Sequence, residues 1–146
     1  MFLEIAIGSP RNRGLLVSLE EYHNYVIDRG SREPVYRSVY LYTDEAQEYV
    51  KKRGTLKDYF GIRGIDDIPV DIDKGDNTDE YTQQKAKDFV NKLEDLDLEY
   101  GNYQIYFSWT GYHIMLSGDL FNFIPNKNLP FVVKQTMLNM SAHIDP

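Results

Sequence analysis

The sequence contains no cysteine and no long apolar run, and these two absences exclude several classes of protein. Without cysteine, the 146-residue chain forms neither disulfides nor thiolate metal sites, and a reducing compartment is compatible with it. No apolar stretch approaches the roughly 20 residues that a helix needs to cross a bilayer, so no membrane partner is expected. The N-terminal stretch MFLEIAIGSP contains Glu4 and lacks a preceding basic region, which is not typical of a signal peptide.

Basic residues are also in short supply. Sixteen Lys and Arg face 23 Asp and Glu, and the formal net charge of −7 argues against non-specific nucleic-acid binding through overall charge. The net charge does not exclude an acidic active site that lies beside a local basic strip. Aromatic residues are abundant, with 12 Tyr and 7 Phe, which makes disorder an unsuitable description. The length predicts one domain with a single substantial core.

The hydrophobic pattern predicts an α+β fold in which this one domain has two lobes. Residues 1–65 approximately form a small β-α-β-α lobe, with strands at 1–7 and 34–42 and helices that begin after Ser18 and Thr43. Residues 66–146 approximately form a β-α-β-β-α-β lobe, the split βαβ or ferredoxin/RRM-like arrangement. Its predicted segments are a strand at 68–73, a helix from Asn77, strands at 102–108 and 112–116, a helix from Pro130 and a last strand at 142–145.

Two aspartates end the predicted strand IPVDID. Residues i and i+2 of a strand point to the same face, so Asp71 and Asp73 would project together. Paired carboxylates suit Mg²⁺ or Mn²⁺, whereas a strand that simply runs into the turn DKGDN explains the same residues without a metal. A calcium loop is excluded, because its sixth and twelfth positions hold Asp76 and Thr82 instead of Gly and Glu.

A second group of polar residues lies in FSWTGYHIML. Gly111 permits a tight turn, which would bring the Ser108 hydroxyl and the His113 imidazole onto one surface. Both side chains can donate hydrogen bonds to phosphate oxygens. The alternative is a hairpin in which the serine caps the turn and the histidine packs at the strand edge.

Asp145 ends the last predicted strand. In the ferredoxin-like order the last strand lies next to the first, so Asp145 would approach Asp71 and Asp73. Three converging carboxylates would hold one or two divalent ions, which support in-line attack on a nucleoside triphosphate. The alternative is an ordinary aspartate near the chain end.

In this order, the three motifs resemble the archaeo-eukaryotic primase superfamily, the primase-polymerases of phage, plasmid, archaeal and eukaryotic replication modules. They are DID at 71–73, S-x-x-G-x-H at 108–113 and the aspartate of HIDP at 143–146. The resemblance implies that Asp71, Asp73 and Asp145 are catalytic ligands of Mg²⁺ or Mn²⁺. It also implies that Ser108 and His113 contact the triphosphate of the incoming nucleotide.

The resemblance extends from about residue 34 to the end, and EPVYRSVY is similar to the N-terminal lobe of virus-type members. Arg37 is the candidate there for a nucleotide or template contact. Many members have glycine where this chain has Trp109, so local shape or sugar selection is expected to differ. Relatives continue past the third motif with a basic segment and further strands, so we expect the chain to be a fragment or one piece of a split enzyme.

The implied function is a DNA primase or polymerase core that joins nucleotides in DNA replication. Its partners would be nucleoside triphosphates, a single-stranded DNA template with primer, and a helicase domain or second subunit. The expected location is the cytoplasm, that of the host for a viral or plasmid protein. The alternative is a non-catalytic ferredoxin-like module that binds nucleotide, single-stranded nucleic acid or a protein, with tyrosines available to stack on bases. Primer synthesis or extension, and deoxy- or ribonucleotide preference, remain open.

Overall fold

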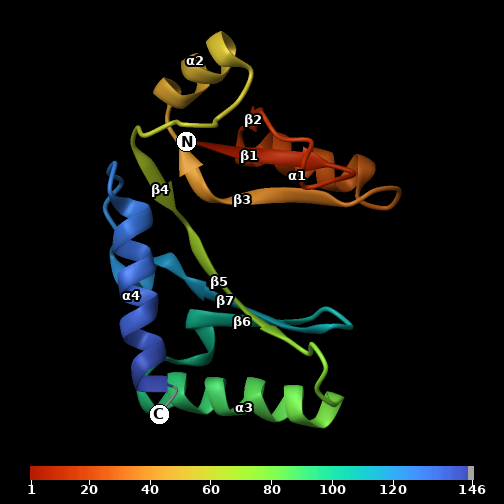
Figure 1. Ribbon diagram of the computed structural model, residues 1–146, viewed down its shortest axis with the longest axis vertical. Coiled ribbons are helices and arrows are strands. Elements are labelled where there is room, and N and C mark those ends of the chain that lie inside the picture. The colour runs from red at the N-terminus through yellow and green to blue at the C-terminus, as the bar shows by residue number, and fades with distance from the viewer. Residues whose placement is uncertain (145–146) are drawn as a thin grey trace. The chain divides into compact units, whose positions relative to one another are not determined.

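The computed structural model describes residues 1–144, which fold into two compact units (Figure 1). The first unit comprises Met1–Asp66 and Phe123–Val133, and the second comprises Asp67–Asn122 with the residues from Lys134 onward. Each unit contains its own antiparallel sheet with helices, so the α+β class predicted from the sequence is confirmed. Asp145, one of the predicted site residues, lies outside the described residues.

The first unit is built on a four-stranded sheet in the order β2-β1-β3-β4. Its described elements are β1 (Phe2–Ile7), β2 (Leu15–Val17), α1 (Leu19–Arg29), β3 (Val35–Tyr42), α2 (Asp44–Arg53) and β4 (Arg63–Ile65). The short strands β2 and β4 lie in segments for which the sequence predicted neither a strand nor a helix. Three residues carry too little periodicity to predict a strand, and tertiary pairing with β1 and β3 forms these two.

The helix ends of the first unit follow local sequence rules. Ser18 accepts a hydrogen bond from the Glu21 amide, and the Glu21 carboxylate accepts one from the Ser18 amide, which completes the predicted capping box of α1. These hydrogen bonds lower the pKa of Glu21. Helix α2 ends at Gly54, whose φ of 73° is the left-handed conformation that favours glycine.

The first unit buries two clusters of apolar side chains. Leu3, Ile5 and Val17 form one cluster, against which tyrosines of α1 pack. The second cluster contains Tyr42, Ala46 and Tyr59. Many of the tyrosines counted in the sequence therefore serve as core residues.

The second unit is a split βαβ arrangement. Its described elements are β5 (Asp67–Asp73), α3 (Asp79–Asp95), the 3-10 turn η1 (Tyr100–Asn102), β6 (Tyr103–Phe107), β7 (Gly111–Ser117) and the 3-10 turn η2 (Gly118–Phe121). Strand β7 lies between β5 and β6 and is antiparallel to both. This is the order that the ferredoxin-like pattern predicts for its first three strands.

Two local predictions for the second unit are wrong. The N-cap of α3 is Thr78 rather than Asn77, since the Thr78 side chain accepts from the Tyr81 amide. The last strand predicted at 142–145 is also wrong over its described part, because α4 (Leu129–Ile144) continues through it. No glycine or proline interrupts residues 131–145, so nothing in the sequence stops the helical hydrogen bonding there.

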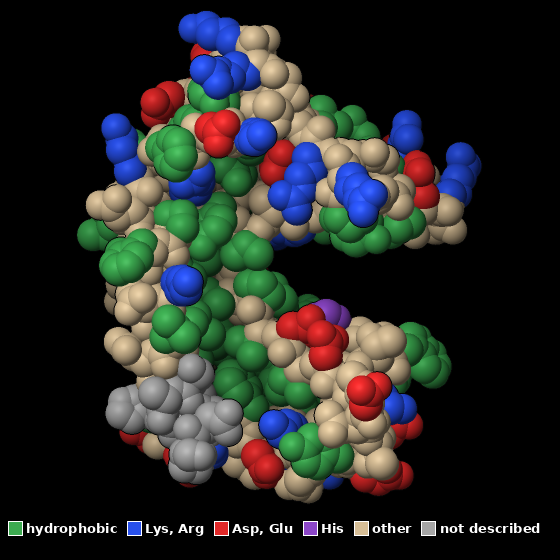
Figure 2. Space-filling view, viewed as in Figure 1, with side chains coloured by type: hydrophobic (Ala, Val, Ile, Leu, Met, Phe, Trp, Pro, Cys, Tyr) green, Lys and Arg blue, Asp and Glu red, His purple; other side chains and the backbone are tan. Residues whose placement is uncertain are grey.

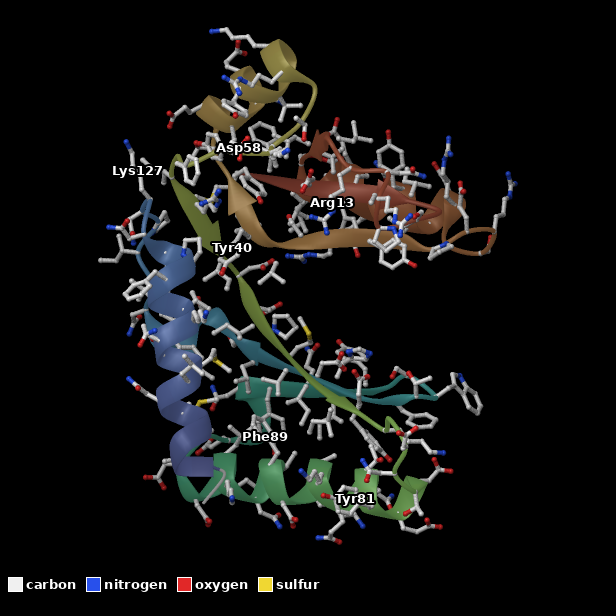
Figure 3. The ribbon with its side chains drawn as sticks, in the orientation of Figure 1. Arg13, Tyr40, Asp58, Tyr81, Phe89 and Lys127 are labelled. Atoms are coloured by element: carbon white, nitrogen blue, oxygen red, sulfur yellow. The ribbon has the colours of Figure 1, made fainter. Side chains whose placement is uncertain are left out.

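One face of the second sheet is buried and the other is open. Helix α3 contacts β5 and β7, and Ile114 and Leu116 of β7 are fully buried. Figure 3 shows Phe89 on the side of α3 that faces the sheet. On β5, Ile68 is buried whereas Asp71 and Asp73 are exposed. The pleat therefore separates an apolar face from a face that carries the two aspartates.

The buried face yields a matched test of this arrangement. Ile114 and Ile105 are directly opposite each other on β7 and β6, but their exposed fractions are 0% and 46%. We expect Ile114→Ala to lower the free energy of unfolding by about 2–5 kcal/mol. The control Ile105→Ala should lower it by about 1 kcal/mol or less. Directly opposite residues lie on the same face, so this pair compares the centre of the buried face with its edge. Denaturant unfolding measures both, and equal losses would contradict the deeper burial of Ile114.

Candidate functional site

The register of β5 against β7 positions three of the predicted site residues on one face of the sheet. Asp71 is directly opposite His113, and Asp73 is directly opposite Gly111. Because Asp71 and Asp73 are two residues apart on β5, they lie on the same open face. The structure therefore places Asp71, Asp73 and His113 on one face, and the shared face of the two aspartates is the arrangement that alternation along the strand predicted.

Asp71 and His113 form an ion pair when the imidazole is protonated. The distance from His113 Nδ1 to Asp71 Oδ1 is 3.1 Å, and the two side chains are 43% and 51% exposed. Figure 2 shows a purple histidine surface beside red acidic side chains over β5 and β7. The contact uses one histidine nitrogen and one carboxylate oxygen. The His113 Nε2 atom and the Asp71 Oδ2 atom remain available to a ligand.

Tyr106 belongs to the same row of side chains, and the sequence reasoning missed it. It is directly opposite His113 on β6 and is 51% exposed. Its hydroxyl donates to Gln104 Oε1 on the same face. The alternation of residues 103–107 was a usable signal, since it places Gln104 and Tyr106 on the face opposite Tyr103 and Ile105.

Gly111 allows β7 to approach β5 closely beside Asp73. A Cβ atom added to Gly111 would collide with the Ile72 carbonyl oxygen and would lie 3.1 Å from the Asp73 Cα atom. The absence of a side chain therefore permits the strand pairing that ends at Asp73. Glycine was predicted here for the turn, whereas the structure assigns it to the close approach of two strands.

Ser108 lies at the start of the hairpin between β6 and β7. Its amide donates to the Gly111 carbonyl oxygen over 3.0 Å, and its hydroxyl donates to the same oxygen over 3.2 Å. Ser108 thus contacts Gly111, and Gly111 is two residues before His113 on β7. The hydroxyl hydrogen bond is the turn-capping role that the sequence left as an alternative. Contact with a phosphate would require the hydroxyl to rotate away from Gly111.

Asp71 and Asp73 are two of the three carboxylates that the sequence predicted as metal ligands, and both are exposed on the open face. Among the described residues, no group of three His, Cys, Asp or Glu side chains is arranged to hold a metal ion. Mg²⁺ commonly takes one or two carboxylates and completes its shell with water and phosphate oxygens. Two exposed carboxylates on one face fit that mode of binding. The third predicted ligand, Asp145, lies outside the described residues.

Arg37 lies in the first unit, on β3. Its Nη2 atom donates to both carboxylate oxygens of Asp66, over 2.8 and 2.7 Å. Arg37 also lines a cavity of about 350 Å³ in the same unit, together with Arg13 and Tyr40, both labelled in Figure 3. Burial raises the pKa of the Tyr40 phenol above its ordinary value. No sequence pattern predicted that Arg37 pairs with Asp66.

Comparisons with known proteins identify no relative of this chain. No family model, curated protein or solved structure matches it. No helix among the described residues is long and apolar enough to span a membrane.

Gly111 offers a test of how the site is held. Placing a Cβ atom against the Ile72 carbonyl forces β5 and β7 apart, so Gly111→Ala should lower the free energy of unfolding by about 1–3 kcal/mol. Gly101→Ala is the control, because an added Cβ there meets no atom within 4 Å. Denaturant unfolding compares the two variants. Wild-type stability of Gly111→Ala would contradict the close approach described here.

Proposed function

We propose that this chain carries the catalytic core of a primase-polymerase, which performs metal-dependent, template-directed nucleotidyl transfer in DNA replication. One observation carries the proposal: two exposed carboxylates, Asp71 and Asp73, share an open sheet face with His113, which pairs with Asp71 at 3.1 Å. The resemblance of the three sequence motifs to the archaeo-eukaryotic primase superfamily supports the same conclusion.

Asp71 and Asp73 would hold Mg²⁺ or Mn²⁺. Their oxygen donors, shared face and exposure fit a hard divalent cation that also binds substrate phosphates. Such an ion stabilises the charge that develops on phosphate oxygens during in-line displacement. Asp145 is the proposed third ligand.

His113 would bind the triphosphate of the incoming nucleotide. Its Nδ1 atom is held by Asp71, and this contact fixes the orientation of the ring. In the protonated ring, the Nε2–H group can donate to a phosphate oxygen while Nδ1–H donates to Asp71. Ser108 would donate a second hydrogen bond after its hydroxyl leaves the Gly111 carbonyl.

The reaction would join a primer 3′-hydroxyl to the α-phosphate of a nucleoside triphosphate. A bond forms between the 3′-oxygen and the α-phosphorus, and the hydroxyl proton passes to water. The bond from the α-phosphorus to the α,β-bridging oxygen breaks, and pyrophosphate leaves with the electron pair. The protein contributes mainly positioning and charge stabilisation. Arg37 is proposed as a nucleotide or template contact, in which case the ligand would compete with Asp66 for its guanidinium. A single-stranded template and a helicase domain or second subunit are the proposed partners.

The aspartate pair has an unusually close control within the chain. Asp71→Asn/Asp73→Asn should weaken Mn²⁺-dependent binding of a nucleoside triphosphate at least about tenfold, because two anionic ligands are lost. The control is Asp95→Asn/Asp97→Asn, which makes the same change of charge at the same spacing at the end of α3. Calorimetric titration with Mn²⁺ and nucleotide measures binding, and extension of a primed template measures transfer. Wild-type binding or synthesis by the first variant would overturn the metal site.

Substitution of His113 should weaken the binding of nucleotide more than the binding of metal. His113→Ala removes a charge-assisted hydrogen bond to phosphate, so the dissociation constant of the triphosphate should rise roughly 10- to 100-fold. Affinity for Mn²⁺ alone should change far less, because both carboxylates remain. The same titrations, run with and without nucleotide, separate the two effects. Equal losses in both would contradict the assigned role.

A non-catalytic binding module is the second candidate. It is favoured because the two proposed phosphate-binding side chains already contact residues of this chain: Ser108 donates to Gly111, and His113 pairs with Asp71. A surface satisfied in this way needs no ligand. Nucleotide binding that does not strengthen when Mn²⁺ is added would favour this module over the enzyme.

A further inference from the structure

The tip of the hairpin between β6 and β7 presents an aromatic side chain in a strained conformation. Trp109 has φ of 65°, in the left-handed region that a bulky residue rarely adopts, and it is 86% exposed. Neither feature stabilises the fold, since glycine would satisfy the same backbone without strain. A residue kept exposed and strained at a loop tip points to a binding role.

Two further aromatic rings accompany Trp109. The Phe107 ring lies 5.4 Å from the Trp109 ring, and 5.5 Å from the Tyr112 ring, with interplanar angles of 55° and 50°. Rings tilted in this way contact each other by edges and leave ring faces uncovered. The exposure of Trp109 shows that most of its surface remains available to a planar ligand.

These aromatic residues line a pocket of about 220 Å³ at the start of α3. Residues that contribute polar groups to it include Lys74, Asp79, Glu80, Thr82 and Gln83. The volume lies below the roughly 300–1,000 Å³ typical of sites for drug-sized ligands, so it suits a single flat ring system. The Gln83 amide offers both a donor and an acceptor, which matches the polar edge of a nucleobase.

The aromatic rings of the pocket lie on the other face of the sheet from the aspartate pair, although Gly111, opposite Asp73, also lines the pocket. Phe107 and Tyr112 are opposite each other in the register and alternate with Tyr106 and His113 along β6 and β7. They therefore belong to the other face of the sheet from the Asp71–His113 pair.

We propose that this pocket binds an unpaired nucleobase, stacked on Trp109. Aromatic side chains stack on bases without regard to sequence, because every base has a π face. The rim carries Asp79 and Glu80, and Lys74 is already paired with Asp79 at 2.7 Å. This charge repels a free triphosphate but accepts the base of a strand whose phosphates lie outside the pocket. The choice of a nucleobase as the planar ligand rests on the proposed function.

The chain contains a single tryptophan, so its fluorescence reports directly on this pocket. Titration of the full chain with oligothymidylate in the presence of EDTA should quench the emission. An oligonucleotide of equal length without bases supplies the same phosphates and should not quench it. Thymidine and thymidine triphosphate distinguish a free ligand from a strand, and we expect the oligonucleotide to quench at the lowest concentration. Absence of quenching, or equal quenching by the abasic strand, would overturn the proposal.

Trp109→Gly separates binding from folding. Its melting temperature should equal or exceed that of the wild type, because glycine relaxes the positive φ. Its affinity for a labelled oligothymidylate, measured by fluorescence anisotropy, should fall roughly 5- to 150-fold, the range for loss of one base–aromatic stack. Trp109→Phe should retain most of the affinity. The control Phe60→Ala removes an exposed aromatic ring, 77% exposed, from the first unit and should bind as the wild type does.

Two outcomes distinguish this proposal from its alternatives. Asp71→Asn/Asp73→Asn should keep wild-type quenching by oligothymidylate, so failure of the nucleotidyl-transfer proposal would leave the pocket intact. Wild-type affinity in Trp109→Gly would overturn the pocket and leave the metal site untouched. The wavelength of maximum emission is also measured at increasing protein concentration without oligonucleotide. A shift in this wavelength would show that a second copy of the chain covers Trp109, which would also overturn the proposal.

Discussion

The pairing of β5 with β7 is the constraint on which the candidate site depends. Its register sets Asp71 opposite His113 and Asp73 opposite Gly111. Side chains alternate with a period of two, so a slip of one residue would move both aspartates into the apolar face and expose Ile72. Burial of Ile68 opposes that slip, since this β5 side chain is buried in the present register and would move to the open face. The core therefore fixes the site without contributing any of its chemistry.

The same strand pair organises two surfaces with different chemistry. On the open face, Asp71 and His113 combine a carboxylate with an imidazole, a pairing suited to a cation and a phosphate. At the hairpin end of the other face, Phe107 and Trp109 present rings and little positive charge. In the two proposals, the open face would contact the phosphates of a nucleotide, whereas the hairpin pocket would contact an unpaired base of a strand. Alternation of side chains along β6 and β7 is sufficient to place the two proposed contacts on opposite faces of the sheet.

The sequence predicted features that depend on local chemistry or on a clear period. The capping box at Ser18 and the left-handed Gly54 follow from residue type, and the face shared by Asp71 and Asp73 follows from alternation. It could not predict β2 or β4, because three-residue strands form only through their partners. It also failed to predict the ion pair of Arg37 with Asp66, which joins residues 29 positions apart. The strand predicted at 142–145 is wrong over its described residues, because no glycine or proline at 131–144 ends α4 before them.

A second D-x-D sequence in the same chain shows why the first one is unusual. Asp95 ends α3 and Asp97 adopts φ of 60°, a helix end and a turn that aspartate tolerates well. Asp71 and Asp73 instead occupy a strand, where aspartate is unfavourable and where two carboxylates on one face repel each other. Neither is buried, so packing gains nothing from them. A local rule that is broken without benefit to the fold is typical of functional positions, and in the proposed function a divalent cation would turn this repulsion into binding.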